Sequence, residues 1–150
     1  MSIDTKQFIH HASIYFENHG WKTTSHPSFD LAVKKEFQTS IVRTIHSLFF
    51  IHTSHMKKEE CLKIIEDIHQ HNGSQPPLVS AVNIIIFVFD DTPPFDISWL
   101  LSNGKKQEIP TARATVSWVV DLPNKKLYTH PGPPFGTKGK KELETILQHL

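Results

Sequence analysis

The chain has 150 residues, of which 38% are hydrophobic and 21% are charged, and its formal net charge is +1. These values are typical of one soluble domain over residues 1–150 and give no overall drive toward nucleic acid. No apolar run approaches the ~20 residues needed to cross a bilayer, so we expect no membrane insertion and a cytoplasmic location. Cys61 is the only cysteine, which excludes an intrachain disulfide and thiolate zinc clusters.

Hydrophobic periodicity and turn residues divide the first half of the chain into five elements. Asp4 followed three places later by Gln7 forms a capping box at the first helix. Cys61, Ile64, Ile65 and Ile68 recur at helical spacing. In order, we expect a helix at 4–18, three antiparallel strands at 21–25, 29–36 and 41–53, and a helix at 57–71.

The segment Val82–Phe89 is the most informative stretch of the sequence. Seven of its eight residues are apolar, most of them β-branched or aromatic, and two carboxylates follow at Asp90 and Asp91. A short apolar run without polar alternation is typical of a strand buried on both faces, in a sheet covered by helices. Ligands tend to bind at the carboxyl ends of such strands, so we expect Asp90 and Asp91 to be binding residues.

The second half of the chain contains turn residues at regular intervals. They predict a short helix capped by Thr92 and ending near Leu101, a polar linker, a hairpin at 114–121 and 127–130, and a helix at 140–150. The fold class expected is therefore α/β (α+β): one mixed sheet with a central buried strand flanked by helices, plus a C-terminal hairpin and helix.

Basic residues suggest two further binding sites. Glycines in the loop Pro131–Gly139 precede the last helix, so its terminal amides together with Lys138 and Lys140 are candidates for anion binding. Ordinary turn chemistry is the alternative reading of this loop. Lysines also occur in adjacent pairs, which indicate either a solvated rim or a phosphate-binding surface. The pairs are 34–35, 57–58, 105–106, 125–126 and 140–141.

No motif predicts a metal or nucleotide site with the required spacing. His52 and His55 are three residues apart, but they straddle the end of a strand and no carboxylate accompanies them at a recognisable interval. A phosphate-binding loop would precede the buried strand, whereas the glycine-rich segment here follows it and contains prolines that remove amide donors. We expect no metal and no cofactor.

The segment Gly20–Lys35, together with the order helix, three strands, helix and buried strand, resembles the core of restriction-endonuclease-like (PD-(D/E)XK-type) proteins. The resemblance implies an aspartate on the second strand that binds Mg²⁺, followed on the next strand by an acidic residue, a spacer and a lysine. Asp30 matches the first position. The third strand offers no carboxylate, and the nearest acidic residue is Glu36. The resemblance therefore implies a degenerate member of the family.

Three functions follow from these observations. The first is a non-catalytic binding or regulatory module, a subunit of a larger assembly with a protein partner or a second copy. The second is a Mg²⁺-dependent nuclease that uses Asp30, Glu36 and Lys34 or Lys35. The third is a nucleic-acid binder that uses the paired lysines without catalysis. We favour the first, because one carboxylate cannot replace two at a metal that cleaves phosphodiesters.

Overall fold

The computed structural model describes residues 4–24, 26–39, 41–53, 55–72, 79–108, 113–130 and 138–150. The helices in these ranges are α1 (Thr5–Asn18), α2 (Lys58–His71), α3 (Ile97–Asn103) and α4 (Lys140–Gln148). The strands are β1 (Lys22–Thr24), β2 (Leu31–Thr39), β3 (Val42–His52), β4 (Val79–Phe89), β5 (Lys105–Glu108), β6 (Arg113–Asp121) and β7 (Lys126–Tyr128).

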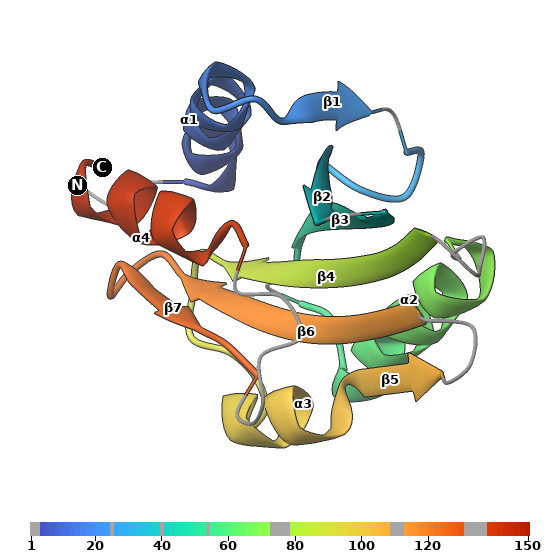
Figure 1. Ribbon diagram of the computed structural model, residues 1–150. Helices are drawn as coiled ribbons and strands as arrows, with labels where there is room; N and C mark the ends of the chain where they lie inside the picture. Colours follow the sequence, from blue (N-terminus) through green and yellow to red (C-terminus); the bar gives the residue numbers. More distant parts are fainter. Residues whose placement is uncertain are drawn as a thin grey trace.

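One mixed sheet joins all of these strands in the order β1-β2-β3-β4-β6-β5, with β7 also paired to β6. The strands β3, β4 and β6 are parallel to one another, whereas β1 and β2 extend the sheet in antiparallel fashion. Helices α1 and α4 lie on one side of the sheet, and α2 and α3 lie on the other (Figure 1). The expected α/β fold class, its mixed sheet and its C-terminal hairpin are confirmed.

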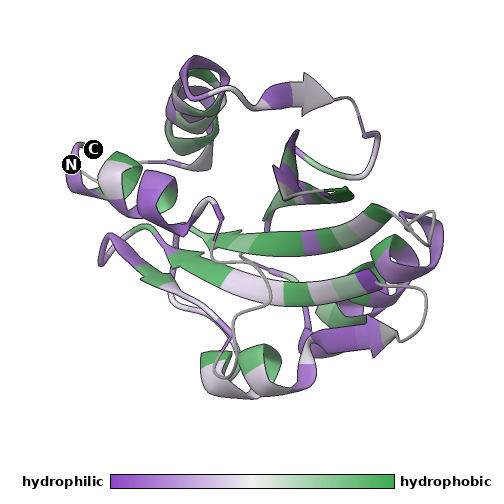
Figure 2. Cartoon of the chain, in the orientation of Figure 1, coloured by the Kyte–Doolittle hydropathy of each residue, from purple (hydrophilic) through white to green (hydrophobic). Residues whose placement is uncertain are grey.

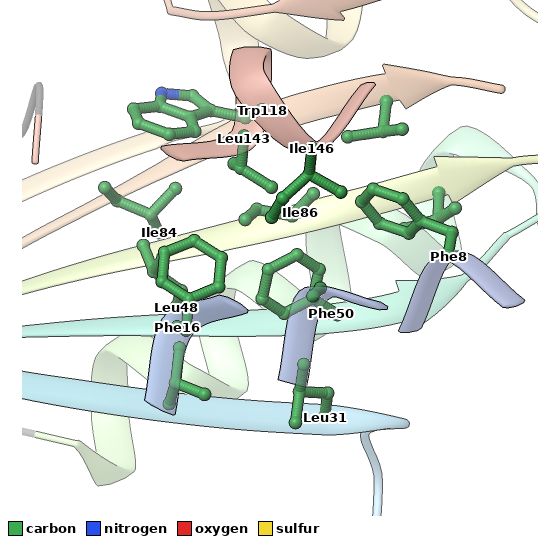
Figure 3. Packing of buried hydrophobic residues seen from close by; sticks show 14 of the residues in the cluster. Phe8, Phe16, Leu31, Leu48, Phe50, Ile84, Ile86, Trp118, Leu143 and Ile146 are labelled. Atoms are coloured by element: carbon green, nitrogen blue, oxygen red, sulfur yellow. The ribbon is translucent and has the colours of Figure 1, made fainter. Parts of the chain in front are cut away.

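The strand β4 is the centre of the core, as its apolar sequence predicts. Ile84 and Ile86 pack toward α1 and α4, while Ile85 and Phe87 pack toward α2 and α3, and all four are fully buried. The apolar colouring of β4 and β6 in Figure 2 reflects this burial on both faces. Figure 3 shows the aromatic and aliphatic side chains packed between the α1/α4 layer and the sheet. Each such side chain stabilises the fold by roughly 1.5–3 kcal/mol through its burial.

The helix α1 begins and ends at residues that the sequence singles out. Asp4 caps its amino terminus by accepting a hydrogen bond from the Gln7 amide at 2.8 Å. Gly20 adopts a φ of +87°, a left-handed conformation that glycine tolerates best, and the Trp21 amide then donates to the Phe16 carbonyl at 3.0 Å. These caps define where α1 begins and ends.

Two expectations for the segment after β4 differ from the structure. The short helix α3 begins at Ile97 and is capped by Asp96, whose Oδ1 accepts from the Ser98 amide at 3.0 Å, and not by Thr92. The stretch read as a polar linker contains β5, which pairs antiparallel with β6. Its side chains give no apolar alternation, because β5 is an edge strand with little to bury.

Within the described residues, no helix is long and apolar enough to cross a bilayer.

A buried polar network joins α2 to the sheet at the amino ends of β4 and β6. Asn83 is fully buried, and its Nδ2 donates to the Asn72 carbonyl at 2.9 Å and to Thr115 Oγ1 at 3.3 Å. The Asn72 side-chain amide donates back to Asn83 Oδ1. His69 Nδ1 lies 2.8 Å from Thr115 Oγ1. Because these polar groups satisfy one another, they can be buried without a large desolvation penalty.

Candidate functional site

The carboxyl ends of β3 and β4 meet the start of β2 at one edge of the sheet. Leu31 pairs with Phe50 in the antiparallel β2–β3 ladder, and the Asp30 amide donates to the Phe50 carbonyl at 2.9 Å. In the parallel β3–β4 ladder, His52 pairs with Val88. The sheet order therefore brings Asp30, His52 and the residue after β4, Asp90, to one edge.

These three side chains form a connected cluster. Asp30 Oδ2 accepts a hydrogen bond from the His52 backbone amide at 2.7 Å. The ring of the same His52 points to β4, with its Nε2 3.1 Å from Asp90 Oδ2. Thr5 Oγ1, in the first turn of α1, donates to Asp90 Oδ2 at 3.2 Å. The cluster Asp30–His52–Asp90, named here the carboxyl-edge cluster, thus links β2, β3, β4 and α1.

The cluster is only partly shielded from water. The side chains of His52 and Asp90 are 44% and 28% exposed, so solvent screens the attraction between them. The arrangement fixes the position of the His52 ring more than it adds stability. The ring is held by Asp90 through Nε2, while the strand that carries it is held by Asp30 through the backbone.

A hollow of about 510 Å³ opens beside this cluster. Its volume lies within the range of sites that bind small molecules or short peptide segments. Five of its lining residues come from the first three turns of α1, and the others come from the sheet edge. The hollow, named here the carboxyl-edge hollow, is lined by Thr5, Lys6, Ile9, His10, Ser13, Asp30, Leu31 and His52.

The two carboxylates expected at the end of β4 have different surroundings. Asp90 joins the carboxyl-edge cluster, as described above. Asp91 is exposed, and its Oδ1 accepts from the Thr92 amide at 2.8 Å, which is the hydrogen bond of a local turn. Asp90, and not Asp91, is therefore the residue of this pair that contacts lining residues of the hollow, namely His52 and Thr5.

The structure does not bring Asp30, Glu36 and Lys34 together. Glu36 lies six positions further along β2, which corresponds to about 20 Å in an extended strand. Its Oε1 lies 3.1 Å from Arg43 Nη1 on the neighbouring strand. Lys34 pairs with Ser47 of β3 and Lys22 of β1, four positions from Asp30. Within the residues that the structure describes, no group of three or more His, Cys, Asp or Glu side chains is arranged to hold a metal ion.

The lysines expected to bind an anion lie where α4 begins. The Lys138 ammonium is 4.8 Å from the centre of the Phe37 ring, near the end of β2 that is opposite Asp30. Lys140 is the first residue of α4 and is half-buried. The segment 131–137, which was expected to complete this anion site, lies outside the described residues. Lys138 thus belongs to a second region, remote along β2 from the carboxyl-edge cluster.

A basic hollow of about 330 Å³ lies at the β1–β2 edge of the sheet. Lys22 and Lys34 face each other across the two strands. Like charges directly opposite in a sheet destabilise it unless an anion or a carboxylate offsets them. The hollow, named here the lysine hollow, is lined by Gly20, Lys22, Lys34, Lys35, Glu36 and Ile45.

His52 is the site residue that the sequence did not predict. Its spacing from His55 drew attention to metal binding, whereas its partners are Asp30 and Asp90. A signal was present in the sequence, because His52 is the polar residue that ends an apolar strand, as Asp90 ends β4. Applying the strand-end rule to both strands would have placed the two residues at one edge.

Comparison of the chain with protein families, curated proteins and solved structures finds no match. The chemistry of the carboxyl-edge hollow is therefore what indicates its use. It combines one ammonium group, two hydroxyl groups and two imidazoles with the carboxylate of Asp30 and the apolar side chains of Ile9 and Leu31. Such a lining can donate hydrogen bonds to a ligand that also buries a small apolar surface.

Proposed function

We propose that this protein acts by binding, as a regulatory module or subunit of a larger assembly, and that the carboxyl-edge hollow is its binding site. The observation that carries the proposal is the fixed position of His52 in the wall of that hollow. Asp30 holds its backbone amide at 2.7 Å, and Asp90 lies 3.1 Å from its ring. A binding site gains affinity when its side chains are ordered before the ligand arrives.

The lining indicates the kind of partner. Lys6 and Ser13 supply hydrogen-bond donors, and Ile9 and Leu31 supply apolar contact. We propose that the occupant is a segment of a partner protein, or of a second copy of this chain, that carries an acidic side chain next to an apolar one. The ammonium group of Lys6 would receive the carboxylate. We propose no resident cofactor. We also propose that the protein acts in the cytoplasm.

The scaffold of this module is proposed to be nuclease-like. The order α1-β1-β2-β3-α2-β4 and the place of Asp30 at the start of β2 support that view. The nuclease alternative needs two carboxylates on one Mg²⁺, whose oxygen ligands stand about 2.0–2.1 Å from the ion. Asp30 and Glu36 are separated by about 20 Å along β2, and Glu36 is paired with Arg43. The geometry therefore favours binding over metal-dependent cleavage.

The partner-binding role is tested by crosslinking from within the hollow. A photoreactive residue replaces His10, and the protein is expressed in its native cells and irradiated. The same residue placed at Lys126, which is exposed on β7, is the control. We expect a discrete crosslinked species from position 10 that Lys6→Glu abolishes and that position 126 does not give. Equal crosslinking from both positions would contradict the proposal.

The nuclease alternative is tested by incubating the purified protein and its Asp30→Ala variant with plasmid DNA in Mg²⁺ or Mn²⁺. We expect the two proteins to leave the plasmid equally intact. Efficient metal-dependent cutting by the wild type, abolished in Asp30→Ala, would contradict the binding proposal and support the nuclease alternative.

A second candidate function, nucleic-acid binding, is favoured by the lysine hollow. Lys22 and Lys34 are opposed across β1 and β2, and Lys35 lines the same hollow. Phosphates placed there would offset the repulsion between the lysines. This candidate predicts binding of duplex or single-stranded DNA that weakens steeply as salt increases, and that Lys22→Gln with Lys34→Gln weakens at every salt concentration. Binding that is absent or insensitive to salt eliminates it.

A further inference from the structure

A cluster of charged and aromatic side chains lies where α4 meets β2, away from the carboxyl-edge hollow. At its centre is the ring of Phe37. The Lys35 ammonium is 5.4 Å from the centre of this ring, and the Lys138 ammonium is 4.8 Å from it. Both distances allow a cation–π contact. The two ammonium groups are thus within about 10 Å of each other, roughly one Debye length at 0.1 M salt, so each feels the other's charge.

A buried imidazole completes the cluster. His46 is directly opposite Lys35 in the β2–β3 register, and its ring meets the Phe37 ring edge-on with the centres 5.0 Å apart. His46 is only 7% exposed, and its Nδ1 is buried without a hydrogen-bond partner. Burial, and then the charge of Lys138, lower the pKa of His46 to about 4. At neutral pH the ring is therefore uncharged, with one polar nitrogen unsatisfied, which is costly in a folded protein.

The amino terminus of α4 adds further donors. Gly139 caps the helix with a φ of +93°, and a Cβ on this residue would lie 2.8 Å from Leu48 Cδ1. The left-handed φ favours glycine at this position, and the missing Cβ also leaves room for the Leu48 side chain of β3. A glycine cap has no side chain, and the backbone amides of the first turn receive no side-chain hydrogen bond from the cap. Such amides attract negative charge.

We propose that Lys35, Lys138 and His46 form a binding site for a small oxyanion of the phosphate type. An anion there relieves the repulsion between the two ammonium groups, and it accepts a hydrogen bond from His46 Nδ1 in the tautomer that carries its proton on that nitrogen. Lys138 is an exposed residue, so an anion can reach its side chain from solvent. This inference is independent of the proposed partner-binding role, because it uses none of the residues of the carboxyl-edge hollow.

Other charged groups around the cluster affect how strongly an anion binds there. Lys35 also donates to the His19 carbonyl at 3.0 Å, so it contributes its charge from a fixed position. Glu36 is bonded to Arg43 and lies on the opposite face of β2 from Lys35, so it does not neutralise the cluster. Glu142 is in the first turn of α4 and opposes an anion. Glu142→Gln is therefore expected to tighten the binding of phosphate.

The test is a titration of the ¹⁵N-labelled protein with inorganic phosphate, with chloride at equal ionic strength as the reference. We expect saturable shifts of the His46 ring nitrogens and of the α4 first-turn amides. Phosphate should also raise the pKa of His46, which a purely structural histidine would not show. Lys138→Gln should weaken binding about tenfold or more, as the loss of one charge-assisted hydrogen bond predicts. Lys126→Gln, an exposed lysine elsewhere, should leave it unchanged.

A wild type without saturable shifts overturns the proposal, and so do equal responses from Lys138→Gln and Lys126→Gln. Far-UV circular dichroism shows that each variant is folded before its binding is compared. A parallel titration with a nucleoside 5′-monophosphate separates two sources of the same chemistry. Tighter binding than inorganic phosphate indicates a phosphate ester as the ligand, and weaker binding indicates the free oxyanion.

Discussion

His52 and Asp90 are joined at the carboxyl ends of adjacent parallel strands, with His52 Nε2 3.1 Å from Asp90 Oδ2. Residues 38 positions apart in the chain thus meet because β3 and β4 are neighbours in the sheet. The contact holds a polar ring at the mouth of a hollow that α1 covers on one side. Its energetic value is small, and its role is to position the ring.

That relationship predicts a measurable coupling between the two side chains. In a double-mutant cycle of His52→Ala and Asp90→Asn, we expect a coupling free energy of about 0.5 kcal/mol, the usual range for partly exposed pairs. Urea unfolding of the four proteins measures it. The exposed pair Glu66–Lys106, 2.9 Å apart, serves as a reference of similar size. Strict additivity of the two substitutions would mean that the contact does not form in solution.

Asn83 is predicted to be essential for stability, although it is a polar residue in the most apolar strand. Asn83→Ala removes two donated hydrogen bonds and leaves the Asn72 side-chain amide without its acceptor, whereas Thr115 keeps its contact with His69. We expect a loss of roughly 2–4 kcal/mol in the free energy of unfolding. Asn18→Ala, at an exposed position of α1, is the matched control and should change it by less than about 0.5 kcal/mol. Similar effects of the two substitutions would contradict the network.

His46 is predicted to make the protein less stable in acid. Its pKa is lowered to about 4 in the folded protein, chiefly by burial, from its ordinary value of 6.5. The unfolded chain therefore binds a proton that the folded chain does not between these two values. The contribution of the neutral His46 to the free energy of unfolding is fully present above pH 6.5 and is lost progressively as the pH falls toward 4. For His46 alone, the loss from pH 7 to about pH 4.5 is roughly 2 kcal/mol.

Urea unfolding at both pH values, for the wild type and for His46→Phe, isolates this contribution. Phenylalanine cannot titrate, and it retains an aromatic ring beside Phe37. All other histidines are common to the two proteins, so their effects cancel in the comparison. We expect the variant to lose less stability in acid than the wild type does. Equal losses would show that the His46 ring titrates freely in the folded state.

Cys61 is predicted to be unreactive in the folded protein. The side chain is fully buried, and burial, aided by Glu60, raises the pKa of its thiol to about 12. At pH 8 only about one thiol in ten thousand is then ionised, and the thiolate is the reactive form. A disulfide reagent such as DTNB should label the native protein only as fast as the protein unfolds, and denaturant should release one equivalent at once. Rapid labelling of the native protein would contradict this burial.

The elements that follow from local pattern could be predicted from the sequence. Asp4 and Gln7 signal the start of α1, and the apolar run 82–89 signals the central strand, because capping and burial depend on neighbouring residues. The edge strand β5 could not be found in this way, since its polar side chains form a strand only by pairing with β6. The start of α3 was misplaced because Asp96 is a better-positioned cap than Thr92.

Single residues of the candidate site could be predicted from the sequence, but their grouping could not. Asp90 follows from the strand-end rule, and Asp30 follows from the resemblance of the segment 20–35. Their meeting at His52 depends on which strands are neighbours, and this is a property of the whole sheet. Glu36 was grouped with Asp30 because the two are close in the chain. An extended strand separates residues six positions apart by about 20 Å, so closeness in the chain does not bring the two carboxylates to one metal ion.

The decisive question for the carboxyl-edge cluster is whether Asp30 binds the His52 amide or a divalent cation. ¹⁵N-labelled protein is titrated with Mn²⁺, whose unpaired electrons broaden the signals of nearby amides, and the intensity at His52 is compared with that at Lys126. We expect stoichiometric Mn²⁺ to broaden the two signals to the same small extent, because Asp30 Oδ2 accepts from the His52 amide at 2.7 Å and the described residues contain no group of three or more His, Cys, Asp or Glu side chains placed to hold a metal ion. Selective broadening at His52 that Asp30→Asn abolishes would contradict it and would identify a metal site.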